Sequence, residues 1–202
     1  MGFFHCSEYV MTALYNRDVL SFDSFLINHS RSYHVAALSC CIEYYLEMRY
    51  CPIIKSLNII SYAGLAMVGL GEAFRKLAMW TAGSNFKHIV ATNKLESHEL
   101  VTTGIYSLCR HPAYAGWFWW AVGTQVLLCN PFCSIAYGWA AYRFFADRLE
   151  YEEYHLLLFF GTQYHRYQQR VPTGVPFVQG YVAREQLLSY LTAREQSAAT
   201  SS

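Results

Sequence analysis

Charged residues are scarce in this chain of 202 amino acids, where Asp, Glu, Lys and Arg together make up 14%. An average soluble domain has about 25%. The 15 basic and 14 acidic residues leave a net charge of +1, which gives no electrostatic footprint for nucleic acid. Hydrophobic residues reach 54%, which excludes an intrinsically disordered chain. The composition therefore predicts a folded protein that contacts a lipid bilayer and does not bind nucleic acid.

The sequence also lacks the short motifs of common cofactor and metal sites. No H-E-x-x-H, P-loop or G-x-S-x-G pattern occurs, and Gly69-Leu70-Gly71 has Phe74 where a dinucleotide-binding loop has its third glycine. The seven cysteines form no C-x-x-C pair, so we expect packed, free thiols. His88, His98 and His111 have no recognisable metal spacing. We therefore expect neither a Rossmann domain nor a metal site.

Long uncharged stretches indicate the fold class. Residues 112–142 contain no Asp, Glu, Lys or Arg, which is too long for one membrane-spanning helix of about 20 residues. Asn130-Pro131 interrupts the stretch, because a residue before proline disfavours the helical conformation. Residues 56–71 are uncharged and rich in small residues that let membrane helices approach closely. Weaker helical segments precede them at 3–15 and 34–48. We predict an all-α, polytopic membrane helix bundle with a helical hairpin at about 112–145.

Charged residues return after the hairpin. Residues 143–170 hold several arginines and carboxylates around an apolar run, which predicts a helix that leaves the membrane and ends near Gly161 or at Arg170. The excess of arginine favours the cytosolic side for this helix. We interpret residues 1–181 as one membrane-embedded domain and 182–202 as a polar tail, helical or disordered.

Two polar features are candidates for chemistry. Glu152 interrupts an apolar helical stripe of Phe145, Leu149, Leu156 and Phe159. Arg148 lies four residues before Glu152, within side-chain reach. This pair is either a surface salt bridge or a partly buried pair that lines a site for a charged ligand. The segment 98–117 gathers His, Tyr, Arg, Gly and Pro residues directly before the hairpin. It is either a site loop or a packed interfacial loop with Arg110 anchored at lipid headgroups.

Several sequence blocks form a recognisable combination: 23–30, 81–86, 100–117, 123–125, 129–131, 143–148 and 170–177. The third block contains the motif Arg110-His111-Pro112-x-Tyr114-x-Gly116. Together the blocks closely resemble the isoprenylcysteine carboxyl methyltransferase family, over about 170 of the 202 residues. The motif alone is shared with wider membrane methyltransferases and sterol reductases, whereas the combination is specific to this family.

The resemblance implies methyl esterification of the C-terminal prenylcysteine α-carboxylate of farnesylated or geranylgeranylated CaaX proteins, with S-adenosylmethionine as cofactor. It implies that Arg148 is the catalytic residue that binds the substrate, and that Ala91 replaces a glutamine usual at one cofactor position. It also implies a multi-pass protein of the endoplasmic reticulum membrane whose active site faces the cytosol. The implied cofactor-binding residues are His98, Glu99, Leu100, Val101, Tyr106, His111, Pro112, Ala113, Tyr114 and Glu152.

The sequence leaves two alternatives to this activity. Family members of animal type carry further membrane helices before the position where this chain starts, so an inactive shortened form acting as a binding or interaction protein is one alternative. The other is a different membrane enzyme on the same scaffold, either a phospholipid methyltransferase or a sterol reductase.

Overall fold

The computed structural model describes residues 2–27, 31–95 and 98–200, and within them every regular element is a helix. The all-α prediction is confirmed. No helix in these described ranges is both long and apolar enough to cross a membrane. Residues 28–30 of the first family block lie outside the described residues. The α-helices are α1 (Gly2–Tyr15), α2 (Arg31–Tyr50), α3 (Asn58–Ala82), α4 (Pro112–Leu127), α5 (Pro131–Arg170) and α6 (Glu185–Thr200).

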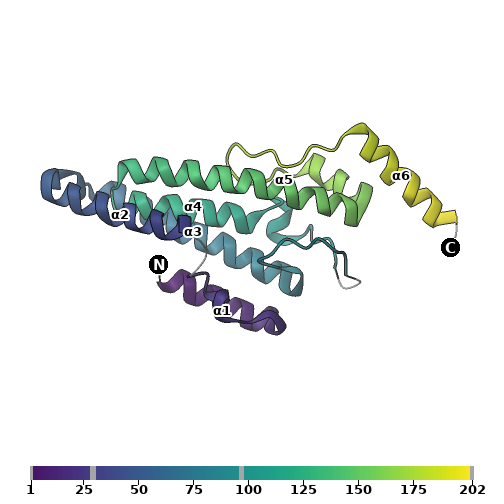
Figure 1. Ribbon diagram of the computed structural model, residues 1–202, viewed down its shortest axis with the longest axis horizontal. Coiled ribbons are helices and arrows are strands. Elements are labelled where there is room, and N and C mark those ends of the chain that lie inside the picture. Colours follow the sequence, from purple (N-terminus) through teal and green to yellow (C-terminus); the bar gives the residue numbers. More distant parts are fainter. Residues whose placement is uncertain (1, 28–30, 96–97, 201–202) are drawn as a thin grey trace.

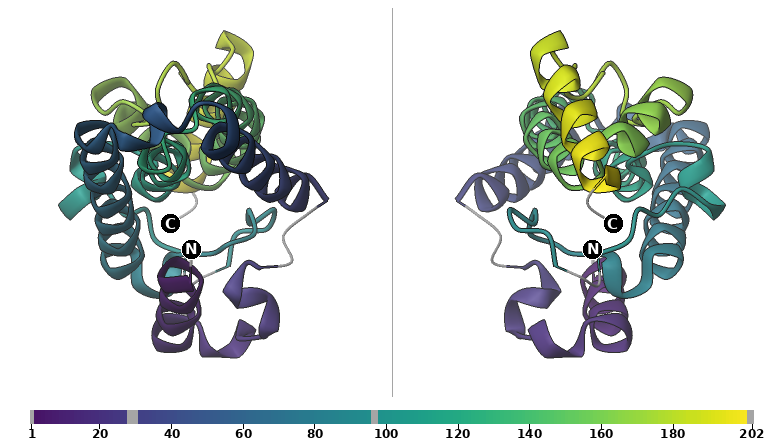
Figure 2. Two further views of the ribbon diagram at one scale, coloured as in Figure 1. Left: turned by 90° about the vertical axis from the view of Figure 1, so that its left-hand side faces the viewer. Right: turned by 90° about the vertical axis from the view of Figure 1, so that its right-hand side faces the viewer.

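Short 3-10 helices connect these elements: η1 (Arg17–Val19), η2 (Phe22–Phe25), η3 (Pro52–Ser56), η4 (Gly83–Asn85) and η5 (Gly104–Ser107). α4 and α5 run beside each other along the length of the molecule (Figure 1). α1 lies at the opposite edge of the molecule from α5 and α6 in both figures (Figures 1 and 2). The segment between η4 and η5 crosses the space between α1 and the α4–α5 pair (Figure 2).

Glycines on both helices let α3 and α4 pack backbone against backbone. A Cβ atom at Gly116 would lie 2.5 Å from the Gly71 carbonyl oxygen and 2.7 Å from the Arg75 nitrogen. Nearer the start of α3, a Cβ atom at Gly64 would lie 2.1 Å from the backbone nitrogen of Leu127 at the end of α4. Real Cβ atoms do not make such contacts, so only glycine fits at these positions. This close packing fixes α4, and with it the residues of its first turn, against α3.

The predicted hairpin at about 112–145 is confirmed in position: α4 and the first part of α5 form it, and α5 extends beyond the predicted limit. Pro131 occupies the first turn of α5, where a missing N–H costs nothing. The carboxylate of Glu43 accepts the Phe132 and Cys133 N–H groups, at 2.8 and 2.6 Å, which satisfies donors that a helix start leaves open. α5 then continues to Arg170 and bends at Gly161, whose φ of 54° suits glycine. Of the two expected ends, Arg170 is therefore the end of α5, and Gly161 is the position of a bend within it.

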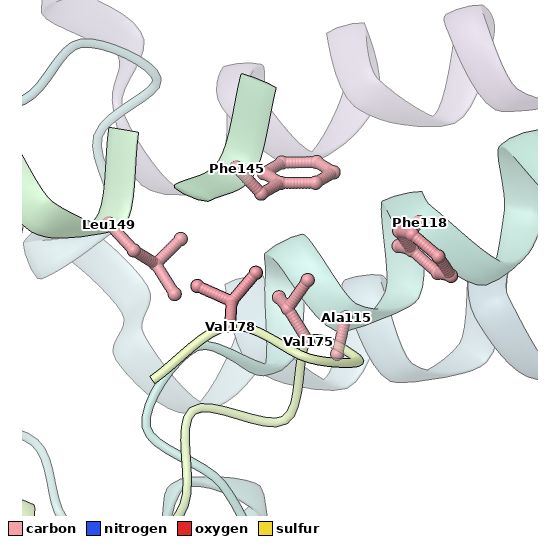
Figure 3. Packing of buried hydrophobic residues seen from close by; sticks show 6 residues of the cluster. All are labelled: Ala115, Phe118, Phe145, Leu149, Val175 and Val178. Carbon is pink, nitrogen blue, oxygen red and sulfur yellow. The ribbon is translucent and has the colours of Figure 1, made fainter. Parts of the chain in front are cut away.

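A loop after α5 folds back onto the hairpin. Val175 and Val178 of this loop pack with Ala115 and Phe118 of α4 and with Phe145 and Leu149 of α5 (Figure 3). Most of the described part of the C-terminal tail forms α6, and Leu191 of α6 is buried against α5. All seven cysteines lie in the described part and are free; Cys6, Cys41 and Cys51 are exposed, and the other four are buried.

Candidate functional site

Two adjoining cavities lie between the segment 82–114 and the middle of α5. Their volumes are about 140 Å³ and about 110 Å³. They share six lining residues and therefore lie side by side. The shared lining residues are Asn85, Lys87, Glu99, Glu152, Leu156 and Phe160.

The structure brings together all ten residues that the sequence analysis assigned to the cofactor. Ala91 lines the second cavity. Arg148 lines neither cavity but is bonded to Tyr114, which does. The binding role of these residues stays a prediction. The ten that line one cavity or the other are His98, Glu99, Leu100, Val101, Tyr106, His111, Pro112, Ala113, Tyr114 and Glu152.

Arg148 and Glu152 are joined through a third residue rather than to each other. Arg148 Nε donates to the Tyr114 hydroxyl at 2.7 Å, and that hydroxyl donates to Glu152 Oε2 at 2.5 Å. Arg148 Nη2 also donates to the His88 carbonyl oxygen. The sequence analysis expected a direct pair, either at the surface or partly buried, and the direct contact was wrong in both cases. The expected partial burial beside a site agrees with the structure, because the Glu152 side chain is 25% exposed and lines both cavities.

The sequence analysis missed Glu153, which accepts more hydrogen bonds than the carboxylates that line the site. Its side chain is fully buried. Burial by itself raises the pKa of Glu153, but hydrogen bonds and positive charge from His111 and Arg110 outweigh it and lower the pKa to about 2. Oε1 accepts from Arg110 Nε at 2.7 Å, His111 Nε2 at 2.9 Å and the Tyr164 hydroxyl at 3.0 Å; Oε2 accepts from Gln168 Nε2 at 3.0 Å and the Tyr181 N–H at 2.8 Å.

The buried stripe of α5 is displaced by one residue from the predicted one. Phe145 and Leu149 are buried as expected, but the row continues through Glu153 and Leu157. The expected row through Glu152 and the observed row through Glu153 both have helical spacing, so the sequence pattern alone did not distinguish between them. A strict four-residue repeat from Phe145 to Leu157 is the signal that identifies the correct row. Glu152, about 100° further round the helix, faces the cavity.

Arg110 is inside the protein, so the alternative that anchored it at lipid headgroups was wrong. The residue is 8% exposed. Besides Glu153, it donates to the carbonyl oxygens of Gln168 and Gln179, both at 3.0 Å, and to that of Val171. Arg110 thus ties the segment before α4 to the end of α5 and to the loop that follows it.

An apolar groove of about 300 Å³ lies on the other side of Arg148, between α2, α4 and α5. The Arg148 guanidinium carbon is 5.4 Å from the ring centre of Tyr114, a cavity residue, and 6.0 Å from that of Phe144, a groove residue. Arg148 therefore lies between the cavity that contains the Glu152 carboxylate and an apolar groove. The groove is lined by Ser32, Tyr33, Ala36, Ala37, Trp117, Trp120, Ala121, Tyr137, Ala140, Ala141, Phe144 and Phe145.

Comparisons with known proteins agree on one family. The model of the isoprenylcysteine carboxyl methyltransferase (ICMT) family matches residues 64–158. Protein-S-isoprenylcysteine O-methyltransferase of Rattus norvegicus is 54% identical over 180 residues, covering 89% of this chain and 63% of that protein. Protein-S-isoprenylcysteine O-methyltransferase B of Arabidopsis thaliana is 47% identical over 177 residues, covering 87% of this chain and 89% of that protein.

A solved structure gives the same result. It is described as the eukaryotic intramembrane Ras methyltransferase ICMT (isoprenylcysteine carboxyl methyltransferase) without a monobody, and it superposes with a TM-score of 0.87 at 47% identity. The match covers 89% of this chain and 64% of that one. This chain therefore spans slightly less than two thirds of the length of the rat protein and of the solved structure.

Proposed function

This chain belongs to the isoprenylcysteine carboxyl methyltransferase family, and on that premise we propose that it methylates the α-carboxylate of a C-terminal prenylcysteine. One observation carries the proposal: Arg148 lies between the cavity that contains the Glu152 carboxylate and an apolar groove. A prenylcysteine has the same division, because a carboxylate and a hydrocarbon chain lie at its two ends. Farnesylated and geranylgeranylated CaaX proteins are the substrates that this division suits.

The two adjoining cavities suit S-adenosylmethionine, which supplies a methyl group on a positively charged sulfur. Glu152 offers a carboxylate for a cationic part of this cofactor, and the rings of Tyr106 and His111 offer stacking surfaces for an adenosine. Burial raises the pKa of Tyr106, and the charge of Glu152 raises it further. Tyr106 therefore stays a neutral ring at physiological pH.

Arg148 is the residue that we assign to the acceptor carboxylate. An α-carboxyl group has a pKa of about 3.5 and is ionised at neutral pH, so the reaction needs no general base. Two of the five N–H groups of Arg148 are held by Tyr114 and the His88 carbonyl. The remaining donors are available for a charge-assisted, bidentate grip on a carboxylate. Catalysis then consists mainly of holding the carboxylate in line with the methyl group.

The apolar groove between α2, α4 and α5 is the site that we assign to the prenyl chain. We further propose that α3, α4 and the first part of α5 are embedded in the membrane of the endoplasmic reticulum, in a multi-pass protein with the cavities open to the cytosol. The intramembrane description of the solved relative supports this placement. The methyl ester product has lost a charge that is costly to bury in lipid.

The experiment uses this 202-residue chain in membranes that lack an endogenous methyltransferase. We expect transfer of labelled methyl from S-adenosylmethionine to a farnesylcysteine analogue. Arg148→Ala should lower kcat/KM about 100-fold or more, because it removes two charge-assisted hydrogen bonds of about 1.5–3 kcal/mol each. Glu152→Ala should raise the KM for the cofactor.

Matched controls lie on the same helix. Arg143 and Glu150 are exposed, and we expect Arg143→Ala and Glu150→Ala to keep wild-type activity. Equal activity of the control and site variants would contradict the proposed roles. Methylation of phosphatidylethanolamine in place of the prenylcysteine analogue, or a folded chain with no turnover, would overturn the proposed reaction.

A further inference from the structure

The segment between α3 and η5 connects α1 to Arg148 through one residue. The ring of His88 contacts α1, and the backbone carbonyl of His88 contacts α5. Its Nε2 atom is 3.2 Å from Thr12 Oγ1 on α1, and its carbonyl oxygen accepts from Arg148 Nη2 on α5. Figure 2 shows this segment crossing between the two helices. A displacement of the His88 ring would therefore also move a direct partner of Arg148.

The hydrogen bonds of Thr12 fix the direction of the contact with His88. The single hydroxyl hydrogen of Thr12 goes to the Glu8 carbonyl oxygen at 2.9 Å, so the hydroxyl oxygen accepts from His88 Nε2–H. Burial and the positive charge of Arg75 lower the pKa of His88 to about 4, although the charge of Glu8 opposes them. The ring is therefore neutral at physiological pH and carries its one proton on Nε2.

A buried ion pair holds α1 in place for this contact. Both oxygens of Glu8, which is fully buried, accept from Arg75 of α3 at 2.7 Å. Arg75 Nη1 also donates to the Ala113 carbonyl oxygen at 3.2 Å, next to Tyr114, the other partner of Arg148. The α1–α3 contact therefore supports Arg148 from two sides: through the His88 carbonyl and through the first turn of α4.

We propose that Thr12 and His88 are positioning residues that orient Arg148 toward the acceptor carboxylate. The inference rests on the proposed function, because Arg148 is taken as the residue that binds the acceptor. Neither residue lines either of the two cavities, and both act through the His88 carbonyl. Their loss should therefore affect acceptor binding and leave cofactor binding unchanged.

The test compares two substitutions on α1. Thr12→Val keeps the side-chain shape and removes the acceptor for His88 Nε2–H. Ser7→Ala is the matched control, because Ser7 Oγ donates to Glu72 of α3 at 2.6 Å and does not contact His88. We expect Thr12→Val to raise the KM for a farnesylcysteine analogue about 5-fold, the value of one neutral hydrogen bond. The KM for S-adenosylmethionine should not change, and Ser7→Ala should change neither KM.

A second measurement does not depend on activity. In protein labelled with ¹⁵N-arginine, the Arg148 Nε–H signal, assigned with Arg148→Lys, reports the bond to Tyr114. We expect faster solvent exchange of this signal in Thr12→Val and no change in Ser7→Ala. Equal effects of the two variants on this signal, or no effect of either, would overturn the inference even if the chain proved inactive. If Thr12→Val is active with the wild-type KM for the farnesylcysteine analogue and its Arg148 signal is unchanged, the inference is overturned and the proposed function is not affected.

Discussion

Glu153→Gln tests the bonding of the buried carboxylate that the sequence analysis missed. Glutamine keeps the shape of the side chain but has one acceptor oxygen in place of two. At least two of the five donors around Glu153 therefore lose their acceptor, and Arg110 loses its counter-charge while it stays buried. Breaking a buried ion pair from one side costs about 3–5 kcal/mol.

The pKa of Glu153 gives a second estimate of the same quantity. The value falls from 4.5 to about 2, and about 1.4 kcal/mol per pKa unit makes this about 3 kcal/mol of stability. Because the pKa is lowered on folding, this stability is present above pH 4.5 and is lost as the pH falls toward 2. The two estimates agree.

Thermal melts followed by tryptophan fluorescence in detergent provide the assay. At pH 7 we expect the Glu153→Gln variant to melt about 6–12 °C below the wild type, from about 2–4 °C per kcal/mol for a chain of this size. The difference should shrink as the pH is lowered from 5 to 3. Glu150→Gln, at an exposed position of the same helix, should melt like the wild type. A difference that stays constant between pH 7 and pH 3 would refute the electrostatic argument.

Two further substitutions test the packing and the cofactor cavities. Gly116→Ala should prevent close packing of α3 and α4 and lower the free energy of unfolding by more than about 3 kcal/mol. Size-exclusion chromatography should then show a loss of folded protein. In the control Gly138→Ala, the added Cβ has its nearest neighbour at 3.8 Å, and this variant should fold normally. Ala91→Gln restores the usual family residue at the wall of the second cavity and should tighten S-adenosylmethionine binding several-fold in calorimetry, whereas an unchanged Kd would argue against a cofactor at that wall.

The sequence predicted the helices well where local chemistry decides them. The absence of charge over 112–142 and the Asn130-Pro131 step sufficed to place the α4–α5 hairpin, because both signals are local. The length of α5 was left open between Gly161 and Arg170. The backbone at Gly161 is non-helical and bends the chain, but a second helical stretch follows it as far as Arg170. The contact between α3 and α4 depends on glycines that face each other across more than 40 positions, and no local pattern pairs them.

The site was less accessible to such reasoning. The spacing of Arg148 and Glu152 indicates two side chains within reach, but it contains no information on Tyr114, which lies 38 residues before Glu152 and separates the pair. The residues alone left the segment 98–117 open between a site and a packed loop. Only the family resemblance assigned cofactor roles within it, and the structure now places those residues around two cavities.

The geometry also gives a physical reason for the Arg-His-Pro-x-Tyr-x-Gly block. Arg110 and His111 both bind Glu153, Tyr114 joins Arg148 to Glu152, and Gly116 lets α3 pack against α4. Most of the block therefore holds the cavity wall together, and its residues need partners from α3, α5 and the loop after α5. Glu153 is the point where these partners meet. A carboxylate with five donors from several segments is recognisable only once the chain is folded, because each donor is unremarkable in its own stretch of sequence.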